Sequence, residues 1–183
     1  MTKSNRTRSV LAATLLAASG ATFVAPSIAN ATGGGPHSET ACFPVLGRIQ
    51  VTVTAEGCTS PVGLCTVGTF RSGYVSGTTR YRATGLGGAP VGEASIVTPA
   101  SEPATTWSYA GELTITTRIG TLVLSDVGVL DTAAGIFTEL NRPVSGTGAL
   151  EGVTGQLFMS GNVTGGGTGF DGQVTGRLCL PTD

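Results

Sequence analysis

The chain has 183 residues, of which 40% are hydrophobic and only 11% are charged, and its formal net charge is −1. Phosphate backbones are bound through clustered Lys and Arg, whereas the arginines here are scattered among acidic residues, so nucleic acid is excluded as an expected partner. The 29 glycines and the frequent threonines favour strands and tight turns over helices.

Residues 1–31 have the three parts of a secretory signal peptide. Three basic residues precede an apolar run over 10–24, and positions 29–31 have the small-x-small pattern that a signal peptidase accepts. A transmembrane anchor is the alternative, but a spanning helix needs about 20 apolar residues, and this run is shorter and is followed by Pro26. We therefore expect cleavage after residue 31 and a secreted, extracellular product without a membrane anchor.

Removal of this leader changes the charge of the chain. Its basic residues are Lys3, Arg6 and Arg8, and Lys3 is the only lysine in the sequence. Seven of the ten basic residues then remain against all eleven acidic ones, which gives a net charge of −4. The remaining length of about 150 residues suits a single domain with a hydrophobic core. We place this domain at 42–183, after a flexible lead-in over 32–41.

Four cysteines, all after the leader, predict disulfide bonds and an oxidising compartment. Four cysteines allow three pairings, and sequence alone does not choose among them. Position favours a local clip between Cys58 and Cys65, which flank a turn-like hexapeptide, and a bond between Cys42 and Cys179 near the two ends of the domain. A zinc site is the rival interpretation, but the chain has no C-x-x-C pair and its lone His37 lies in a Gly/Pro linker. We expect no metal and no cofactor.

The first half of the domain alternates apolar and polar residues in short runs between glycine-rich turns. Residues 49–53 have the period-two pattern of a half-buried strand. Further strand candidates are 65–74 and 77–85. The segment 86–104, which contains several prolines, is long for a loop of a compact domain, and we interpret it as a lid or an exposed flap.

The second half continues the same alternation. The strongest strand pattern covers 105–118, and the next run, 121–130, is apolar on both faces, which is typical of a strand that is covered on both sides. Three more strand candidates follow, at 136–140, 156–163 and 168–179. About eight antiparallel strands can close into a barrel, which removes exposed sheet edges. We therefore predict an all-β fold, a single antiparallel barrel of about eight strands.

The glycine-rich turns near the end of the chain carry a resemblance. The stretches GTGALEGVTG (146–155), LEGVTGQLFMSGNV (150–163) and GFDGQVTGRLCL (169–180) resemble barrels of the allene oxide cyclase and dirigent type. They are similar above all to secreted bacterial proteins of uncharacterised function that carry such a barrel. The resemblance covers 105–180 well and 42–104 loosely. It implies an eight-stranded antiparallel barrel with a largely apolar central cavity that a few acidic, Arg or Tyr residues line.

Six residues are candidates for lining this cavity: Tyr81, Trp107, Tyr109, Asp126, Glu139 and Arg142. Asp126 shares a face with apolar residues, so an inward face would bury its carboxyl group and raise its pKa. The alternative is an outward face, or a bulge that begins at Asp126. Glu139 and Arg142 form either an ion pair in the cavity or a solvated pair at the rim. The three aromatic residues line a pocket or belong to the plain core.

Catalytic motifs are absent from the sequence. The lone histidine lies in the expected lead-in, so no Ser-His-Asp or Cys-His system is available, and no glycine run precedes a Gly-Lys-Ser/Thr. We expect a non-catalytic barrel that binds an apolar small molecule or has a structural role. The alternative is a barrel similar to a cyclase or isomerase, in which a buried acid and a tyrosine steer an apolar substrate. A polysaccharide-binding or adhesion module is a third option. The first two hypotheses differ in whether Asp126 and Glu139 point inward.

Overall fold

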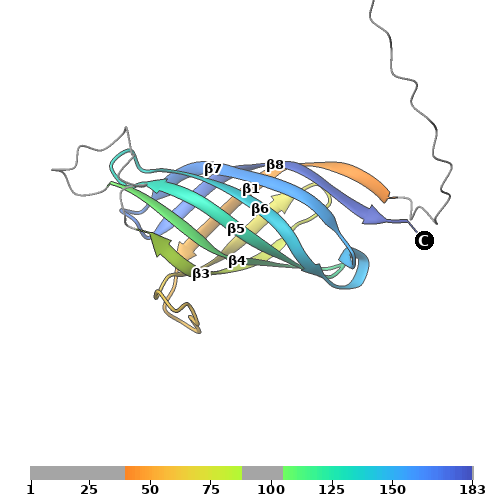
Figure 1. Cartoon of the computed structure of the whole chain (residues 1–183), viewed down its shortest axis with the longest axis horizontal. Coiled ribbons are helices and arrows are strands. Elements are labelled where there is room, and N and C mark those ends of the chain that lie inside the picture. The colour runs from red at the N-terminus through yellow and green to blue at the C-terminus, as the bar shows by residue number, and fades with distance from the viewer. Residues whose placement is uncertain (1–39, 88–104, 183) are drawn as a thin grey trace, which may run out of the picture. The chain divides into compact units, whose positions relative to one another are not determined.

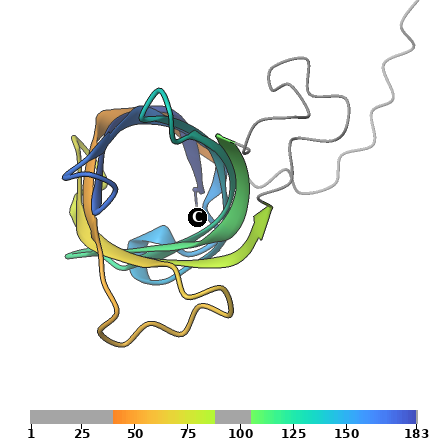
Figure 2. The same cartoon turned by 90° about the vertical axis from the view of Figure 1, so that its left-hand side faces the viewer.

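The computed structural model describes residues 40–87 and 105–182, which form eight strands and one short 3-10 helix. In chain order they are β1 (Thr40–Val53), β2 (Cys65–Ser72), β3 (Gly77–Gly87), β4 (Thr106–Thr117), β5 (Thr121–Asp131), β6 (Ile136–Gly146), η1 (Gly148–Leu150), β7 (Thr154–Thr164) and β8 (Gly169–Pro181). Each strand pairs antiparallel with the next, and β8 pairs with β1 to close the barrel (Figure 1). Figure 2 shows the strands as a closed ring. The predicted all-β, eight-stranded antiparallel barrel is confirmed.

Strand boundaries differ from the expected ones where a neighbouring strand offers partners. β1 starts at Thr40, inside the expected lead-in 32–41, because its first residues pair with the end of β8. β3 continues through Leu86 and Gly87, which pair with the start of β4. The rest of the expected 86–104 loop lies outside the described residues, as do the expected signal peptide 1–31 and residues 32–39 of the lead-in.

The hairpin between β5 and β6 shows how short polar turns close the strands. Oδ1 of Asp131 accepts the backbone N–H groups of Ala133 and Ala134, both at 2.9 Å. Gly135 then takes a φ of +66°, a left-handed conformation that suits glycine. The turn therefore holds the start of β6 in register beside the end of β5.

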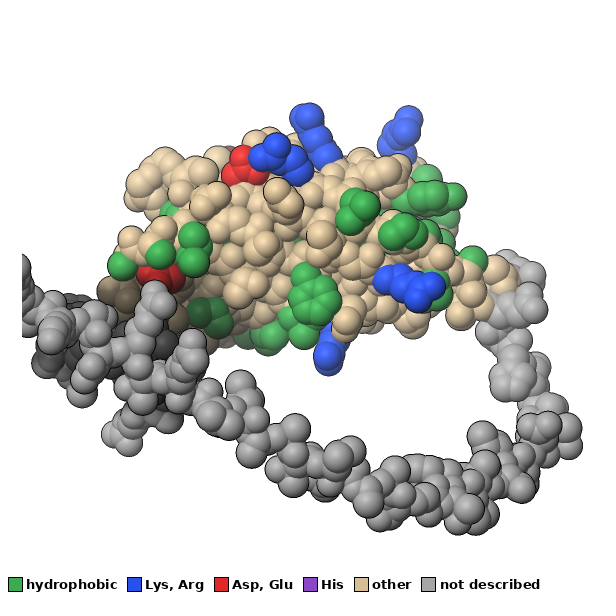
Figure 3. All heavy atoms as spheres, turned by 90° about the horizontal axis from the view of Figure 1, so that it is seen from above, with side chains coloured by type: hydrophobic (Ala, Val, Ile, Leu, Met, Phe, Trp, Pro, Cys, Tyr) green, Lys and Arg blue, Asp and Glu red, His purple; other side chains and the backbone are tan. Residues whose placement is uncertain are grey.

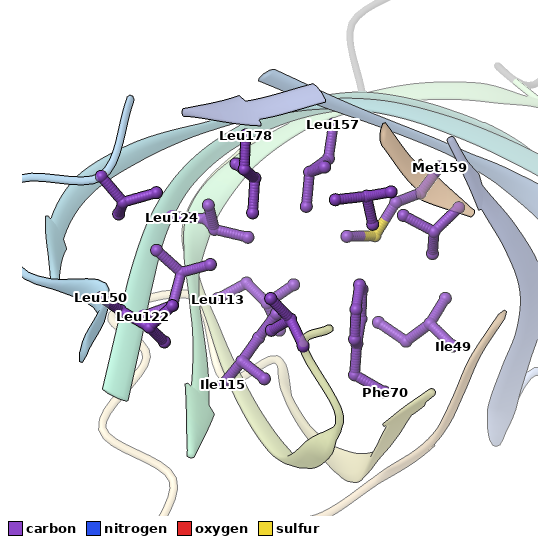
Figure 4. Packing of buried hydrophobic residues seen from close by; sticks show 14 of the residues in the cluster. Ile49, Phe70, Leu113, Ile115, Leu122, Leu124, Leu150, Leu157, Met159 and Leu178 are labelled. Atoms are coloured by element: carbon purple, nitrogen blue, oxygen red, sulfur yellow. The ribbon is translucent and has the colours of Figure 1, made fainter. Parts of the chain in front are cut away.

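Aliphatic and aromatic side chains fill the barrel interior toward one end. These residues alternate along their strands with outward-facing ones, as the pleat of a strand requires. Figure 4 shows the side chains meeting inside the barrel. The largest fully buried ones include Phe70, Ile115, Leu122, Leu124, Leu150, Leu157 and Leu178. Leu150 comes from η1, so the 3-10 helix contributes a side chain to the core. This end of the barrel is the one where β5 begins and β8 ends.

Two disulfide bonds reinforce the barrel, and both expected pairings are confirmed. Cys42 and Cys179 are direct cross-strand neighbours on β1 and β8, so their bond joins the two ends of the domain at the closing seam. Cys58 and Cys65 clip the connection between β1 and β2. No free cysteine remains among the described residues. Paired cysteines of this kind indicate an oxidising compartment.

On the face in Figure 3, most of the surface is tan, formed by uncharged polar side chains and backbone, and Arg side chains and hydrophobic patches are spread over it. In residues 40–87 and 105–182 there is no helix with the length and apolar character needed to cross a membrane.

Candidate functional site

A cavity of about 290 Å³ lies inside the barrel beside the core, with which it shares Ile49, Leu113 and Phe137. It lies at the end where β3 ends and β4 begins, and most of its walls are aliphatic and aromatic. The polar side chains that line it are Thr66, Tyr81, Tyr109, Thr132 and Glu139. The volume is close to the lower end of the range for small-molecule sites, so the barrel has room for a compact ligand.

A tyrosine and a glutamate face each other across a glycine in the wall of this cavity. Tyr109 on β4 pairs in register with Gly128 on β5, which in turn pairs with Glu139 on β6. The ring of Tyr109 lies over Gly128, where an added Cβ would overlap it. The Tyr109 hydroxyl thereby reaches Oε1 of Glu139 and donates a hydrogen bond of 2.8 Å. The Tyr109–Glu139 hydrogen bond therefore requires a residue without a side chain at position 128.

A related arrangement occurs one strand earlier, where the tyrosine pairs not with the glycine but with Leu113, two residues away from it. Tyr81 on β3 lies over Gly111 on β4, and an added Cβ at Gly111 would overlap its ring and hydroxyl. Gly111 pairs directly with Asp126 on β5. The Tyr81 hydroxyl is near enough to Asp126 to act on its pKa, although neither this hydroxyl nor Oδ1 of Asp126 completes a hydrogen bond within the described structure. Two tyrosine–glycine–acid rows therefore lie side by side, with one tyrosine on each of β3 and β4.

Asp126 is buried and holds a proton near neutral pH. Its side chain is 2% exposed, and burial, followed by the negative charge of Glu139, raises its pKa to about 8. The Tyr81 hydroxyl and the backbone of Gly111 act in the opposite direction but do not outweigh burial. At pH 7 the carboxyl group is therefore mostly neutral and can donate a hydrogen bond.

Asn141 complements both acids. It is fully buried on β6 and is the direct cross-strand neighbour of Asp126. Its Nδ2 donates to Oε2 of Glu139 at 3.4 Å, while its Oδ1 has no partner among the described residues. A protonated Asp126 supplies the kind of donor that this amide oxygen lacks. The amide therefore lies between a neutral acid and a carboxylate acceptor.

Glu139 is the acid that meets the cavity. Burial raises its pKa, whereas the hydrogen bonds from Tyr109 and Asn141 lower it. Burial also raises the pKa of both tyrosines, and the neighbouring acids raise it further, so Tyr81 and Tyr109 remain protonated donors. Glu139 and Tyr81 line the cavity and Asp126 does not. A ligand in the cavity would therefore contact Glu139 and not Asp126.

Of the six expected site residues, four line the cavity, Asp126 is buried outside its lining, and Arg142 lies on the outer face. Tyr81, Trp107, Tyr109 and Glu139 line the cavity, with Trp107 36% exposed near its mouth. Asp126 is buried but does not belong to the cavity lining.

The expectation for Arg142 was wrong. Arg142 is exposed on the outer face of β6 and does not line the cavity. Residues three positions apart on a strand lie on opposite faces, so Glu139 inside the barrel cannot share its face with Arg142. No ion pair joins the two residues among those described; the ion pairs on the barrel surface are Arg48–Asp171 and Arg82–Glu112.

Sequence reasoning missed Asn141 and the two glycines. Asn141 lies two positions after Glu139 and therefore on the same face of β6. A glycine inside a strand pattern signals close approach by another group, and Gly111 and Gly128 each interrupt an otherwise well-patterned strand. Those two signals were present in the sequence.

In the part of the chain that the structure describes, no group of three or more His, Cys, Asp or Glu side chains is placed to hold a metal ion.

In comparisons with protein-family models, curated proteins and solved structures, nothing matches this chain.

Proposed function

We propose that this chain is a secreted barrel that binds a small, largely apolar molecule in its cavity without catalysing a reaction. The observation that carries the proposal is the Tyr109–Glu139 pair in a cavity of about 290 Å³ with mostly apolar walls. Binding sites commonly combine apolar walls with a few fixed polar groups that orient the ligand. Burial of the ligand's apolar surface supplies affinity, and the Tyr109–Glu139 pair fixes its polar end.

A binding experiment with a matched pair of variants tests this proposal. The neutral fluorophore N-phenyl-1-naphthylamine, whose emission rises in apolar surroundings, serves as the probe. Leu130 lines the cavity, whereas the preceding residue on β5, Val129, is 38% exposed. We expect Leu130→Trp to weaken probe binding about tenfold or more, a loss of about 1.4 kcal/mol, and Val129→Trp to leave it unchanged. Equal effects of the two variants, or no probe binding by the unmodified protein, would contradict the proposal.

Secretion is part of the proposal. The two disulfide bonds indicate an oxidising compartment, and the sequence pattern of residues 1–31 supports export through a cleaved signal peptide. N-terminal sequencing of the exported protein is expected to begin at Thr32. A product that keeps Met1 would contradict cleavage.

A second candidate function is that of a cyclase or isomerase acting on an apolar substrate, as the resemblance to allene oxide cyclase and dirigent-type barrels implies. The convergence of two tyrosines with Asp126 and Glu139 favours it, since a general acid works best with a pKa near the operating pH. Against it, Asp126 does not line the cavity. NMR analysis of a bound ligand after long incubation separates the two functions. We expect the ligand to be recovered unchanged; a rearranged product that Glu139→Gln abolishes would favour the enzyme.

A further inference from the structure

The interior of the barrel carries acidic groups without a basic partner. Asp126 and Glu139 point inward from neighbouring strands. All seven arginines of the domain lie among the described residues, and none lines the cavity. Six of them are exposed, and the seventh, Arg82, is paired with Glu112 at 3.5 Å. Within residues 40–87 and 105–182, therefore, no basic side chain lines the cavity.

The contacts of Glu139 are those of a carboxylate acceptor. Both oxygens accept hydrogen bonds, Oε1 from Tyr109 and Oε2 from Asn141. These donors are neutral, so they satisfy the oxygens without cancelling the charge. A buried carboxylate normally has a cationic partner. Asp126, on the neighbouring strand, has an unpartnered Oδ1 and is 2% exposed. The negative charge of Glu139 is therefore not offset by a cationic side chain of the described residues.

Aromatic rings surround the same cavity. Trp107, Tyr81, Tyr109, Phe137 and Phe170 all line it, and the last two rings pack edge to face with centroids 5.6 Å apart. The face of an aromatic ring attracts a cation, most strongly when the pair is shielded from water. A ring-lined pocket with one carboxylate favours a positively charged ligand with an apolar body, and it disfavours an anion, which would meet Glu139 as a like charge.

We propose that the ligand of this cavity is a small apolar amine whose ammonium group pairs with Glu139, an inference that rests on the binding function proposed above. The apolar body of the ligand lies against the aliphatic and aromatic walls near Leu113, Leu130 and Phe137. The ammonium group donates to Glu139, which keeps its hydrogen bonds from Tyr109 and Asn141 because a carboxylate has about four acceptor positions. The bound cation supplies the charge that the interior lacks.

Three probes with one apolar skeleton test the proposal by calorimetry on the unmodified protein: 3-phenylpropylamine, 3-phenylpropanol and 3-phenylpropionate. We expect the amine to bind about 10- to 100-fold more tightly than the alcohol, the gain typical of a hydrogen bond to a charged group. We expect the propionate to bind most weakly. Alcohol binding with no advantage for the amine would overturn this inference and leave the cavity-binding function standing. Binding of none of the three would overturn both.

A variant then assigns the preference to Glu139. Glu139→Gln keeps an acceptor for the Tyr109 hydroxyl and removes the buried charge, so we expect the variant to fold. It should bind the amine and the alcohol with nearly equal affinity. Glu112→Gln, which removes an acid on the outer face of β4, is the matched control and should keep the preference for the amine. An amine preference that survives in Glu139→Gln would overturn the assignment.

Discussion

Tyr109 donates a hydrogen bond to Glu139 two strands away, over a glycine that leaves its ring room to pass. The pair connects β4 to β6 without a direct contact between their backbones. Because the hydroxyl is fixed at 2.8 Å from Oε1, the carboxylate has a defined orientation toward the cavity. The Tyr81 ring likewise lies over a glycine, Gly111, although its hydroxyl completes no hydrogen bond, so the polar part of the site depends on two glycines as much as on two acids.

Gly128→Ala tests the close approach of the ring. The added Cβ overlaps the Tyr109 ring, so the ring must move away from Glu139. We expect a loss of about 1–3 kcal/mol in the free energy of unfolding, as for other overpacked positions, measured by urea denaturation. Gly85→Ala on β3 is the control, because nothing lies within 4 Å of its Cβ position. Equal losses in the two variants would contradict the role of Gly128.

Tyr109→Phe keeps the ring and removes the hydroxyl. Glu139 then loses one of the hydrogen bonds that lower its pKa, so the pKa of Glu139 should rise further above its usual value. We expect a loss of roughly 1.5–3 kcal/mol in stability where Glu139 is ionised. Carbon-13 NMR titration of the carboxyl group measures the shift. Tyr74→Phe, at an exposed tyrosine on the barrel surface, should leave the titration of Glu139 as it is.

Asp126 makes the stability of the barrel depend on pH. Its pKa rises from 3.8 in the unfolded chain to about 8 in the folded protein, so between these values the folded state binds more protons. The contribution of Asp126 is therefore fully present below about pH 3.8 and is lost as the pH rises through about 8. Glu139, whose pKa is also raised, acts in the same direction.

Asp126→Asn removes this dependence at one position. We expect the free energy of unfolding of this variant to decline less between pH 4 and pH 8 than that of the unmodified protein. At pH 8 it should exceed the unmodified protein by on the order of 1–3 kcal/mol, because Asn needs no proton to stay neutral. Urea denaturation at a series of pH values measures the decline. Glu151→Gln, at an exposed turn, should reproduce the slope of the unmodified protein, and an equally steep slope in Asp126→Asn would refute the assignment.

The two disulfide bonds should differ in their effect on stability. The Cys42–Cys179 bond closes 137 residues and the Cys58–Cys65 bond closes seven. Constraint of the unfolded chain grows with loop length, to about 5 kcal/mol for the long closure and roughly 2–3 kcal/mol for the short one. We expect replacement of both cysteines of the long closure by Ser to cost more in urea denaturation than the same change at the short one. The reverse order would contradict this account.

Period-two alternation predicted much of the architecture. It placed the strands, and on β4 it put Trp107 and Tyr109 on one face because alternate residues of a strand share a face. The disulfide pairing followed from position, since the two ends of a closed barrel meet where β1 and β8 pair. These features depend on local patterns and on chain ends, and both can be read from a sequence.

The polar part of the site depends on packing that the sequence does not display. β5 is apolar on both faces, so alternation alone could not decide which way Asp126 points. Glu139 and Arg142 are close in sequence but do not pair, because residues three positions apart on one strand point to opposite faces. Asn141 was missed because its role depends on Asp126, which it meets only when β5 and β6 are paired, as well as on Glu139 of its own strand.

Intermolecular nuclear Overhauser effects from bound 3-phenylpropanol test the central claim most directly. The probe is neutral, so its location reports the cavity itself and not the charge of Glu139. We predict contacts with the methyl groups of Ile49, Leu113 and Leu130, which line the cavity, and none with Leu157 or Leu178 in the packed half of the barrel. Contacts confined to exposed side chains of the outer face, such as Val127 and Phe158, would contradict the claim that the barrel binds its ligand inside.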